Sequence, residues 1–559
     1  MMQKNGSEIL VECLLEQGVD TVFGYPGGSV LNIYDALYKY SDRITHVLTA
    51  HEQGAAHAAD GYARATGRVG VCIATSGPGA TNLVTGIATA YMDSIPMVAI
   101  TGNVAVPLLG RDSFQEVDIT GITMPVTKYN FIVKRVEDLA DTVRKAFIIA
   151  KSGRPGPVLV DIPKDVTAAL AEYEPVPAAP ARPAEPPKEE RLTMTKERLA
   201  SCRQPLIYFG GGVISSGAEA ELLALAESQD IPVCASMMGL GGFPARHRLW
   251  LGMVGMHGTL AANRAARECD LLLVCGARFS DRVAGSRTGF APHAEVVHID
   301  VDHAEFDKNI PAAVRVAGDL KEVLARLADG LPPRRHEAWN QGLEACRRPV
   351  VPDLSDPDAV PDPLAILQTL RRLTPDDTVV ATDVGQHQMW TAQHFEMRAP
   401  RTFLTSGGLG TMGYGLGAAI GGQFGCPDKR VVLISGDGSF HMNLNELTTL
   451  ASYNLPIVVL VMNNRVLGMV RQWQKVFYGR RFSATDPHRK TDLVKLAEAF
   501  GCTGMRIART GDIEPVLRAA LAAGGPVVVD CQISPDANVL PMIPPGGTVE
   551  NILLEMEED

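Results

Sequence analysis

The sequence predicts an α/β protein with three domains, each built around a doubly wound parallel sheet. Short apolar runs rich in β-branched residues alternate with helical patterns along most of the chain. This alternation is typical of parallel strands joined by helical crossovers. The chain has 559 residues, more than one hydrophobic core can organise. Two proline-rich stretches, residues 174–190 and 349–363, lack apolar periodicity and therefore predict linkers.

The linkers divide the chain into an N-terminal domain of residues 1–173, a central domain of residues 191–348 and a C-terminal domain of residues 364–559. Strands are expected in the first two domains near residues 21–23, 44–48, 69–74, 97–101, 158–161, 206–209, 231–235, 271–275 and 296–300. Because such strands are bounded by helical patterns, each sheet should carry helices on both faces.

The clearest βαβ unit lies in the C-terminal domain. The apolar run Val431–Ser435 stops at a Gly-Asp-Gly turn containing Asp437, and Pro456–Met462 stops just before Asn464. Parallel strands end at the same sheet edge, so Asp437 and Asn464 should come together where open α/β sheets bind ligands. A carboxylate and an amide oxygen suit Mg²⁺ shared with phosphates and water. The alternative is a glycine-rich turn followed by an asparagine cap.

The N-terminal domain contains a partial copy of this unit. Ser76–Gly79 follows an apolar strand as Ser435–Gly438 does, and Pro96 follows the first serine by 20 residues where Pro456 follows the second by 21. In the first copy Pro78 stands in place of the aspartate. The sequence therefore predicts two related domains, of which only the C-terminal one holds the metal.

Composition excludes several classes of function. The net charge is −11, from 52 basic and 63 acidic residues, which argues against nucleic acid and anionic membranes as partners. The ten cysteines form no C-x-x-C pair and predict reduced, buried thiols in a cytoplasmic protein. The N-terminus carries Glu8, Glu12 and Glu16 among its apolar residues. Because a signal peptide needs an uninterrupted apolar stretch, this segment is not expected to be one. Phe403–Cys426 is weakly polar but glycine-rich and is expected to be buried in the protein.

The Gly-Asp-Gly turn followed by Asn-Asn resembles the motif of thiamine diphosphate enzymes that act on 2-oxo acids. The resemblance implies that the third domain binds the cofactor's diphosphate through Mg²⁺, while the first binds the aminopyrimidine of a neighbouring subunit's cofactor. Asp437, Asn464 and the backbone carbonyl of Val466 would hold the metal. The cofactor-binding residues of this domain would also include Gly436, Gly438, Ser439, Gly410 and Met412.

A second segment, Leu48–Ala55, resembles the part of that family that supplies a catalytic glutamate, here Glu52. A carboxyl group sharing a proton with a ring nitrogen would favour the imino form of the aminopyrimidine. Alone, a strand-terminal glutamate is more often a charge at a helix N-terminus. The resemblance also implies that Gly410 contacts the ring through its backbone and that Met412 is the wedge that bends the cofactor.

Within that family, nine segments resemble the large subunit of acetohydroxyacid synthase, also called acetolactate synthase. They begin at Tyr25, Thr75, Phe114, Gly153, Gly255, Gly276, Gly385, Gly468 and Pro541. The resemblance implies that pyruvate is decarboxylated and its two-carbon unit joined to pyruvate or 2-oxobutanoate, which gives precursors of branched-chain amino acids. The alternatives are another enzyme of this fold, such as a pyruvate oxidase, and a non-catalytic paralogue.

The same resemblance assigns residues to the substrate. Arg282 would recognise the carboxylate of the second 2-oxo acid with its planar guanidinium, although most arginines are surface or ion-pair residues. Trp473 would favour 2-oxobutanoate over pyruvate by about 1–3 kcal/mol, the usual value of one methylene, although a tryptophan is as often ordinary core. Gln115 would hydrogen-bond the reacting groups, and Phe114 would line the pocket beside it.

The central domain raises the question of a flavin. Gly210–Gly212 follows a strand, but no complete G-x-G-x-x-G is present, so the local pattern is weak. The resemblance implies a structural FAD that takes no part in redox chemistry, near Arg154, Gly211, Gly212, His257, Arg278, Asp300 and Asp319. It further implies a homodimer or homotetramer with shared active sites, and a small regulatory subunit as partner.

Overall fold

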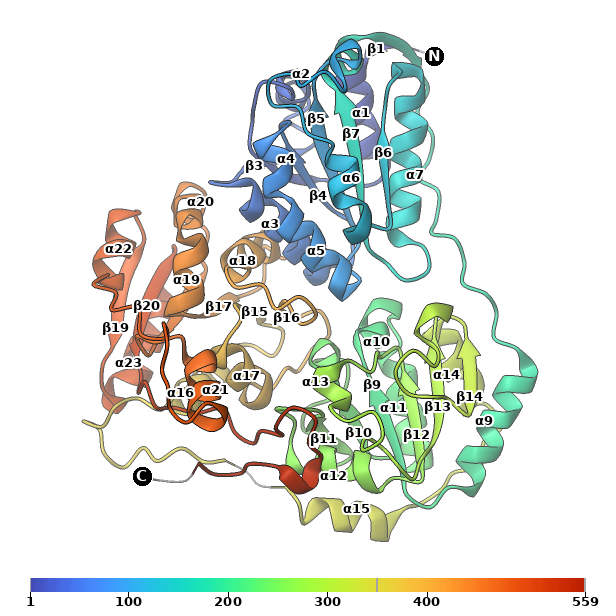
Figure 1. The fold of residues 1–559 in the computed structure, drawn as a ribbon, viewed down its shortest axis with the longest axis vertical. Coiled ribbons are helices and arrows are strands. Elements are labelled where there is room, and N and C mark those ends of the chain that lie inside the picture. The colour runs from blue at the N-terminus through green and yellow to red at the C-terminus, as the bar shows by residue number, and fades with distance from the viewer. Residues whose placement is uncertain (1, 348–349, 557–559) are drawn as a thin grey trace.

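The computed structural model describes residues 2–347 and 350–556, in which it forms three six-stranded parallel sheets (Figure 1). The N-terminal domain runs from blue to teal, the central domain from green to yellow-green, and the C-terminal domain from pale gold through orange to red. Helices pack on both faces of every sheet. The predicted fold class, three doubly wound parallel-sheet domains, is confirmed.

The N-terminal sheet has the strand order β3-β2-β4-β5-β7-β6. Its strands are β2 (Thr21–Gly24), β3 (Thr45–Leu48), β4 (Gly70–Ala74), β5 (Met97–Asn103), β6 (Tyr129–Ile132) and β7 (Pro157–Pro163). One face packs against α1 (Gly6–Glu16), α2 (Leu31–Lys39) and α7 (Leu139–Lys151), and the other against α3 (Glu52–Thr66) and α5 (Val84–Asp93). The sequence reasoning did not foresee an antiparallel pair outside this sheet, β1 (Met2–Asn5) with β8 (Leu170–Tyr173).

The C-terminal sheet has the order β16-β15-β17-β18-β20-β19. Its strands are β15 (Val379–Thr382), β16 (Phe403–Leu404), β17 (Val431–Gly436), β18 (Val458–Asn463), β19 (Thr503–Ile507) and β20 (Val527–Gln532). It packs between α16 (Pro363–Leu373), α17 (Gln386–His394) and α23 (Ile513–Ala522) on one face and α18 (Gly415–Gly425), α20 (Leu447–Ser452) and α22 (Leu493–Ala499) on the other. Its strand order repeats that of the N-terminal sheet, which is the arrangement an internal repeat produces.

The central sheet differs, with the order β11-β10-β9-β12-β13-β14. Its strands are β9 (Pro205–Phe209), β10 (Val233–Ala235), β11 (Trp250–Met253), β12 (Leu271–Cys275), β13 (Glu295–Asp300) and β14 (Val314–Ala317). The covering helices are α9 (Glu189–Ser201), α11 (Glu219–Gln229) and α14 (Leu320–Ala328) on one face and α12 (Leu260–Glu268) and α15 (Glu337–Glu344) on the other. This is the strand order of dinucleotide-binding folds, in which the switch point lies between the first and fourth strands.

The remaining helices are mostly short. They are α4 (Pro78–Asn82), α6 (Ile119–Thr123), α8 (Lys164–Ala168), α10 (Gly211–Ser216), α13 (Asp281–Ala284), α19 (Asp437–Asn443) and α21 (Gly468–Phe477). None of the helices in the described ranges combines the length and apolar character that a membrane crossing requires.

Helices α3 and α18 join the N- and C-terminal domains by direct backbone contact. A Cβ atom at Gly421 would overlap the carbonyl oxygen of Ala58, and one at Gly61 would overlap that of Ala418. Only glycine lets two helix backbones approach this closely. The apolar residues of both helices belong to one continuous core that runs between the two sheets, so the two domains are fixed relative to each other.

Gly421→Ala should therefore destabilise the contact between the domains. We expect a loss of about 1–3 kcal/mol, typical of overpacking a tight site, measured as a lower denaturation midpoint of the cofactor-free protein. Gly342→Ala on α15 is the matched control, because Gly342 has no heavy atom near its Cβ position. That variant should be neutral or stabilising, by up to about 1 kcal/mol. Equal midpoints for the two variants would contradict the close contact.

Candidate functional site

The carboxyl ends of β17 and β18 lie side by side in the C-terminal sheet. Gly436 of β17 is in register with Met462 of β18, so Asp437 and Asn464 follow neighbouring strand ends. Asp437 is the first residue of α19, and both side chains are buried. The structure thus places the two expected side-chain metal ligands at one sheet edge.

The Asp437 carboxylate has a cation as its neighbour. Burial raises the pKa of Asp437 to about 6, and the Arg489 guanidinium opposes this shift. Arg489 Nη1 lies 3.4 Å from Asp437 Oδ2, longer than a close ion pair. A buried carboxylate whose negative charge is incompletely compensated has the chemistry that a bound cation would complete.

The amide of Asn464 is held in one orientation. Its Oδ1 accepts a hydrogen bond from the backbone N–H of Val466 at 3.1 Å, and its Nδ2 donates to Gln386 Oε1 at 3.1 Å. Gln386 in turn donates to Gln472. Among the described residues no three His, Cys, Asp or Glu side chains gather into a metal-binding group. One carboxylate, one amide and backbone oxygens, completed by phosphate and water, is a donor set that fits Mg²⁺.

The segment that carries Gly410 and Met412 approaches this edge. A Cβ atom at Gly438 would lie 3.8 Å from the Met412 methyl group and 2.8 Å from Leu467. Gly410 has φ +71°, and within 4 Å a Cβ there would meet only Val384. Its backbone is exposed to open space, as a surface that receives a planar ring would be.

Two more of the expected cofactor residues have contacts within the protein. A Cβ atom at Gly436 would lie 2.7 Å from the His387 ring, so glycine is needed for packing there. The Ser439 hydroxyl donates to the carbonyl oxygen of Val384 at 2.7 Å. The hydroxyl oxygen can still accept a hydrogen bond from a cofactor, but the contact that the structure shows for Ser439 is the hydrogen bond to Val384 within the protein.

Glu52 lies in the other half of the predicted site. It is the first residue of α3, and its Oε2 accepts a hydrogen bond from Asn82 at 3.0 Å. Its Oε1 lies 3.1 Å from the Cβ position of Gly79. In the part of the chain that the structure describes, the hydrogen bonds of this carboxylate stay within the N-terminal domain. A single chain therefore does not join Glu52 to the metal edge.

Glu446 is a functional candidate that the sequence reasoning missed. It lies in the turn η6 (Leu444–Glu446) after α19, and its carboxylate accepts hydrogen bonds from the backbone N–H groups of Ala50 at 3.1 Å and His51 at 3.0 Å. Burial raises its pKa. The C-terminal domain thus holds the residues just before Glu52. The available signal was that Glu446 is the only acidic residue of the sequence 443–452, which alternates leucine with small polar residues.

Arg282 and Trp473 come together from different domains. The Arg282 guanidinium lies over the indole ring, 5.6 Å from its centroid, a cation–π distance. Trp473 is half-buried on α21, whereas the Arg282 side chain is 61% exposed. The exposed, planar cation beside an aromatic wall leaves room for a small carboxylate.

Phe114 and Gln115 are on the surface of the N-terminal domain. Phe114 is 87% exposed, and Gln115 has a positive φ of 59° beside Gly77. Their loop is held by Glu116, whose carboxylate accepts a hydrogen bond from the N–H of Ser113 at 2.9 Å. At this exposure Phe114 is a surface residue of one chain, so its role in lining a substrate pocket stays a prediction.

The residues expected around FAD are divided between two boundaries of the central domain. Arg154 Nη1 lies 2.8 Å from Glu305, and its Nε donates to Ser94. Arg278 Nη2 donates to the carbonyl oxygen of Met92 at 2.6 Å. Both arginines therefore connect the central and N-terminal domains.

The remaining FAD candidates have unequal roles. Gly212 packs directly against Gly276, and a Cβ at Gly211 would make only ordinary contacts. Asp319 caps α14. Burial raises the pKa of Asp300 to about 6.

The buried His257 lines a cavity of about 1090 Å³ between the central and C-terminal domains. Burial lowers the pKa of His257 to about 4, and its Nδ1 has no hydrogen-bond partner among the described residues. His257 follows the edge strand β11, two strands away from β9 at the switch point, and its unpaired buried nitrogen fits a polar group bound in the cavity. The usual acidic residue after the second strand is absent, since Ala235 is followed by Ser236.

Comparison with known proteins decides the family. Models for the thiamine pyrophosphate enzymes match the chain in three parts: the N-terminal TPP binding domain at residues 4–122, the central domain at 192–327 and the C-terminal TPP binding domain at 383–531. A probable acetolactate synthase large subunit of Methanocaldococcus jannaschii is 47% identical over 98% of this chain and 95% of its own length. The chain belongs to the acetolactate synthase large-subunit family of thiamine pyrophosphate enzymes.

Two further members of this acetolactate synthase family are similar over almost their whole length. The acetolactate synthase isozyme 2 large subunit of Escherichia coli is 46% identical, with coverage of 98% of this chain and 99% of its own. The large subunit of Corynebacterium glutamicum is 46% identical over 98% and 90%, respectively. The two TPP binding domain models fall on the two sheets that share one strand order, so thiamine diphosphate is the cofactor of this fold.

Asp437→Asn should weaken binding of Mg²⁺ and thiamine diphosphate by about 10- to 100-fold, the value of a lost charged contact. Calorimetric titration of Mg²⁺ at a fixed cofactor concentration measures the effect. Asp428→Asn is the control, because Asp428 is exposed and should leave both affinities unchanged. Unaltered Mg²⁺ affinity in Asp437→Asn would rule out this carboxylate as a ligand.

Proposed function

We propose that the protein is the catalytic subunit of an acetolactate synthase. It would decarboxylate pyruvate and join the two-carbon unit to a second pyruvate or to 2-oxobutanoate, giving 2-acetolactate or 2-aceto-2-hydroxybutanoate and CO₂. The relatives named above are acetolactate synthase large subunits. The observation that carries the proposal is the Arg282–Trp473 pair, because it supplies a carboxylate receptor beside an apolar wall, as a second 2-oxo acid requires.

The cofactor, when bound, supplies the carbon nucleophile at which a 2-oxo acid loses CO₂. Asp437, Asn464 and the carbonyl of Val466 would hold Mg²⁺ and, through it, the diphosphate. The Glu52 carboxylate would keep a proton on a nitrogen of the aminopyrimidine. Glu446 would fix the backbone from which Glu52 projects.

We propose that two subunits share each active site. Glu52 keeps its hydrogen bonds within the N-terminal domain, and Phe114 is 87% exposed in one chain. In a dimer, the N-terminal domain of one subunit would bring Glu52, Phe114 and Gln115 to Gly410 and the metal edge of the other. Phe114 and Gly410 are exposed in one chain, so such an association can cover them.

For the acceptor, Arg282 would bind the carboxylate with its guanidinium fork. Trp473, on the C-terminal domain, would contact the alkyl end. The two side chains lie in contact. With its carboxylate bound to Arg282, the acceptor would therefore place its alkyl group against Trp473, and the extent of that contact would depend on the length of the alkyl group. This arrangement explains how a difference of one methylene could be recognised.

Three further components remain proposals. FAD would be structural and lie at the switch point of the central sheet, which has the dinucleotide-binding strand order; the absorption spectrum of the purified protein tests for it. The relatives' names call them large subunits, which supports a small regulatory partner. A cytoplasmic location stays a prediction from the sequence.

The activity is tested by incubating the protein with pyruvate, thiamine diphosphate and Mg²⁺ and assaying acetolactate, peroxide and acetyl phosphate. Acetolactate should be the main product, and Glu52→Gln should lose at least about 100-fold in kcat, the usual range for a proton-transfer group. Glu8→Gln, at the first turn of α1, should keep full activity. Peroxide as the main product would point to a pyruvate oxidase, and no turnover to a scaffold or a missing subunit.

Trp473→Leu should change the choice of acceptor. When pyruvate and 2-oxobutanoate compete, the preference for 2-oxobutanoate should fall by about 10-fold or more, corresponding to roughly 1–3 kcal/mol per methylene. The ratio of the two products measures this directly. The control is Trp339→Phe, which changes a buried tryptophan of the central domain and should leave the ratio unchanged.

A further inference from the structure

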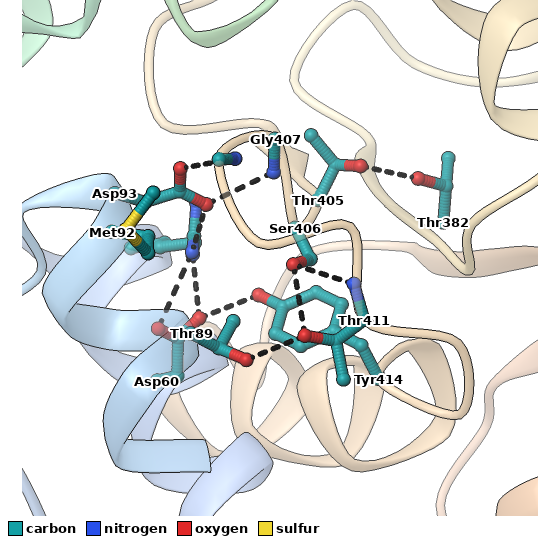
Figure 2. Close-up of polar contacts among 12 residues, drawn as sticks. Asp60, Thr89, Met92, Asp93, Thr382, Thr405, Ser406, Gly407, Thr411 and Tyr414 are labelled. Atoms are coloured by element: carbon teal, nitrogen blue, oxygen red, sulfur yellow. Dashed lines mark hydrogen bonds and ion pairs between the residues drawn. The ribbon is translucent and has the colours of Figure 1, made fainter. Parts of the chain in front are cut away.

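Residues 405–414, the segment between β16 and α18, are fastened to the N-terminal domain by a set of polar contacts (Figure 2). Asp93, the last residue of α5, accepts a hydrogen bond from the backbone N–H of Gly407 at 3.0 Å on Oδ2 and from that of Gly408 at 2.7 Å on Oδ1. The Asp93 side chain is fully buried. A carboxylate that engages two successive N–H groups fixes the direction of the backbone as well as its position.

Arg64 of α3 holds the other side of Asp93. Its Nη2 lies 2.9 Å from Asp93 Oδ2, and its Nε lies 2.5 Å from Asp60 Oδ1. The Tyr414 hydroxyl donates to the same oxygen of Asp60 at 2.6 Å. The guanidinium also lies over the Tyr414 ring, 5.5 Å from its centroid. These contacts connect α3, α5 and the beginning of α18 in one cluster, as Figure 2 shows.

A chain of hydroxyl groups supports the same segment from within. Thr89 of α5 shares a hydrogen bond of 2.7 Å with Thr411. The Ser406 hydroxyl accepts from the Thr411 N–H at 3.0 Å and closes the turn between them. The segment is therefore held at both ends from α5, at Gly407–Gly408 and at Thr411.

The cluster of charges is poorly explained by stability alone. Asp60 and Asp93 have no exposed side-chain surface, and Arg64 has 4%. Burial works against the charge of Arg64, but the neighbouring carboxylates raise its pKa well above the ordinary value. Buried ion pairs of this kind can usually be replaced by apolar side chains with little loss of stability. Their particular effect is to fix geometry.

The geometry that they fix is that of the ring-binding candidates. Gly410 lies between the two anchored ends of the segment, with an exposed backbone at φ +71°. Met412 follows Thr411 directly and reaches to 3.8 Å from the Cβ position of Gly438. A shift of about 1 Å in such a segment can cost 100-fold in a reaction that depends on placement.

We propose that Asp93, held by Arg64, which Asp60 in turn orients, is a positioning residue that sets residues 407–412 for the aminopyrimidine ring of the cofactor. Asp93 does not touch the cofactor; it acts through the backbone of Gly407 and Gly408. This inference rests on the proposed function, because it takes thiamine diphosphate as the ligand of this edge. It further requires that the N-terminal domain affects how tightly the C-terminal domain of the same chain binds the aminopyrimidine ring.

The test compares two ligands on full-length Asp93→Asn. Thiamine diphosphate and inorganic diphosphate are each titrated in the presence of Mg²⁺ by calorimetry. The Kd for thiamine diphosphate should rise by at least about tenfold, because the ring contacts are misplaced. The Kd for inorganic diphosphate should not change, since Asp437, Asn464 and α19 are left intact.

Glu16→Gln is the matched control, because it makes the same chemical change in another ion pair of the N-terminal domain. Glu16 pairs with Arg144 at 2.8 Å, and its side chain is only 8% exposed. This variant should lower the denaturation midpoint and leave both dissociation constants at wild-type values.

Thr89→Val provides a second variant if Asp93→Asn does not fold. It keeps the side-chain shape and removes the hydroxyl that meets Thr411, so it should also raise the Kd of thiamine diphosphate alone. Wild-type affinity in every folded variant would overturn the inference, and so would an equal rise for both ligands. A wild-type protein that binds no thiamine diphosphate would instead overturn the proposed function.

Discussion

The backbone contact between α3 and α18 is the constraint on which the rest of the site depends. Glycine at residues 61 and 421 lets the two helices touch main chain to main chain, and their apolar faces merge the cores of two domains into one. Because α3 begins at Glu52, this contact determines where the proposed catalytic carboxylate sits. Since α18 follows the segment with Gly410, the same contact places that segment.

The contact has polar reinforcement at both ends of α3. At its beginning, Glu446 of the C-terminal domain accepts two backbone N–H groups from residues 50 and 51. Near its end, Arg64, which is paired with Asp60, holds Asp93 and through it the segment 407–412. One helix of the N-terminal domain is thus connected both to the turn after α19 and to the segment that is proposed to meet the aminopyrimidine ring. In the proposed dimer, α3 would contribute to two active sites. Its first residue, Glu52, would enter the site of the other subunit, and Arg64 in its last turn would position residues 407–412 of its own chain.

The central domain has a different strand order from the other two domains, and this order could not be predicted from the sequence. The strands near residues 206–209 and 271–275 are expected from their apolar runs, but only pairing shows that they are neighbours. The edge strands β11 and β14 were not predicted, because each is short and partly exposed. Exposed edges mix polar with apolar residues, so their pattern is not distinct from that of a loop.

The class of each domain, the internal repeat and the sheet edge proposed to hold the metal could all be predicted from the sequence, because apolar runs and the Gly-Asp-Gly turn are local features. Asp437 and Asn464 could be placed at one edge since parallel strands must end together. Three contacts became known from the folded chain alone: Arg282 with Trp473, Glu446 with the backbone before Glu52, and Asp93 with Gly407 and Gly408. Each of these contacts joins residues that lie far apart in the chain, and no local pattern encodes a distance between separate domains.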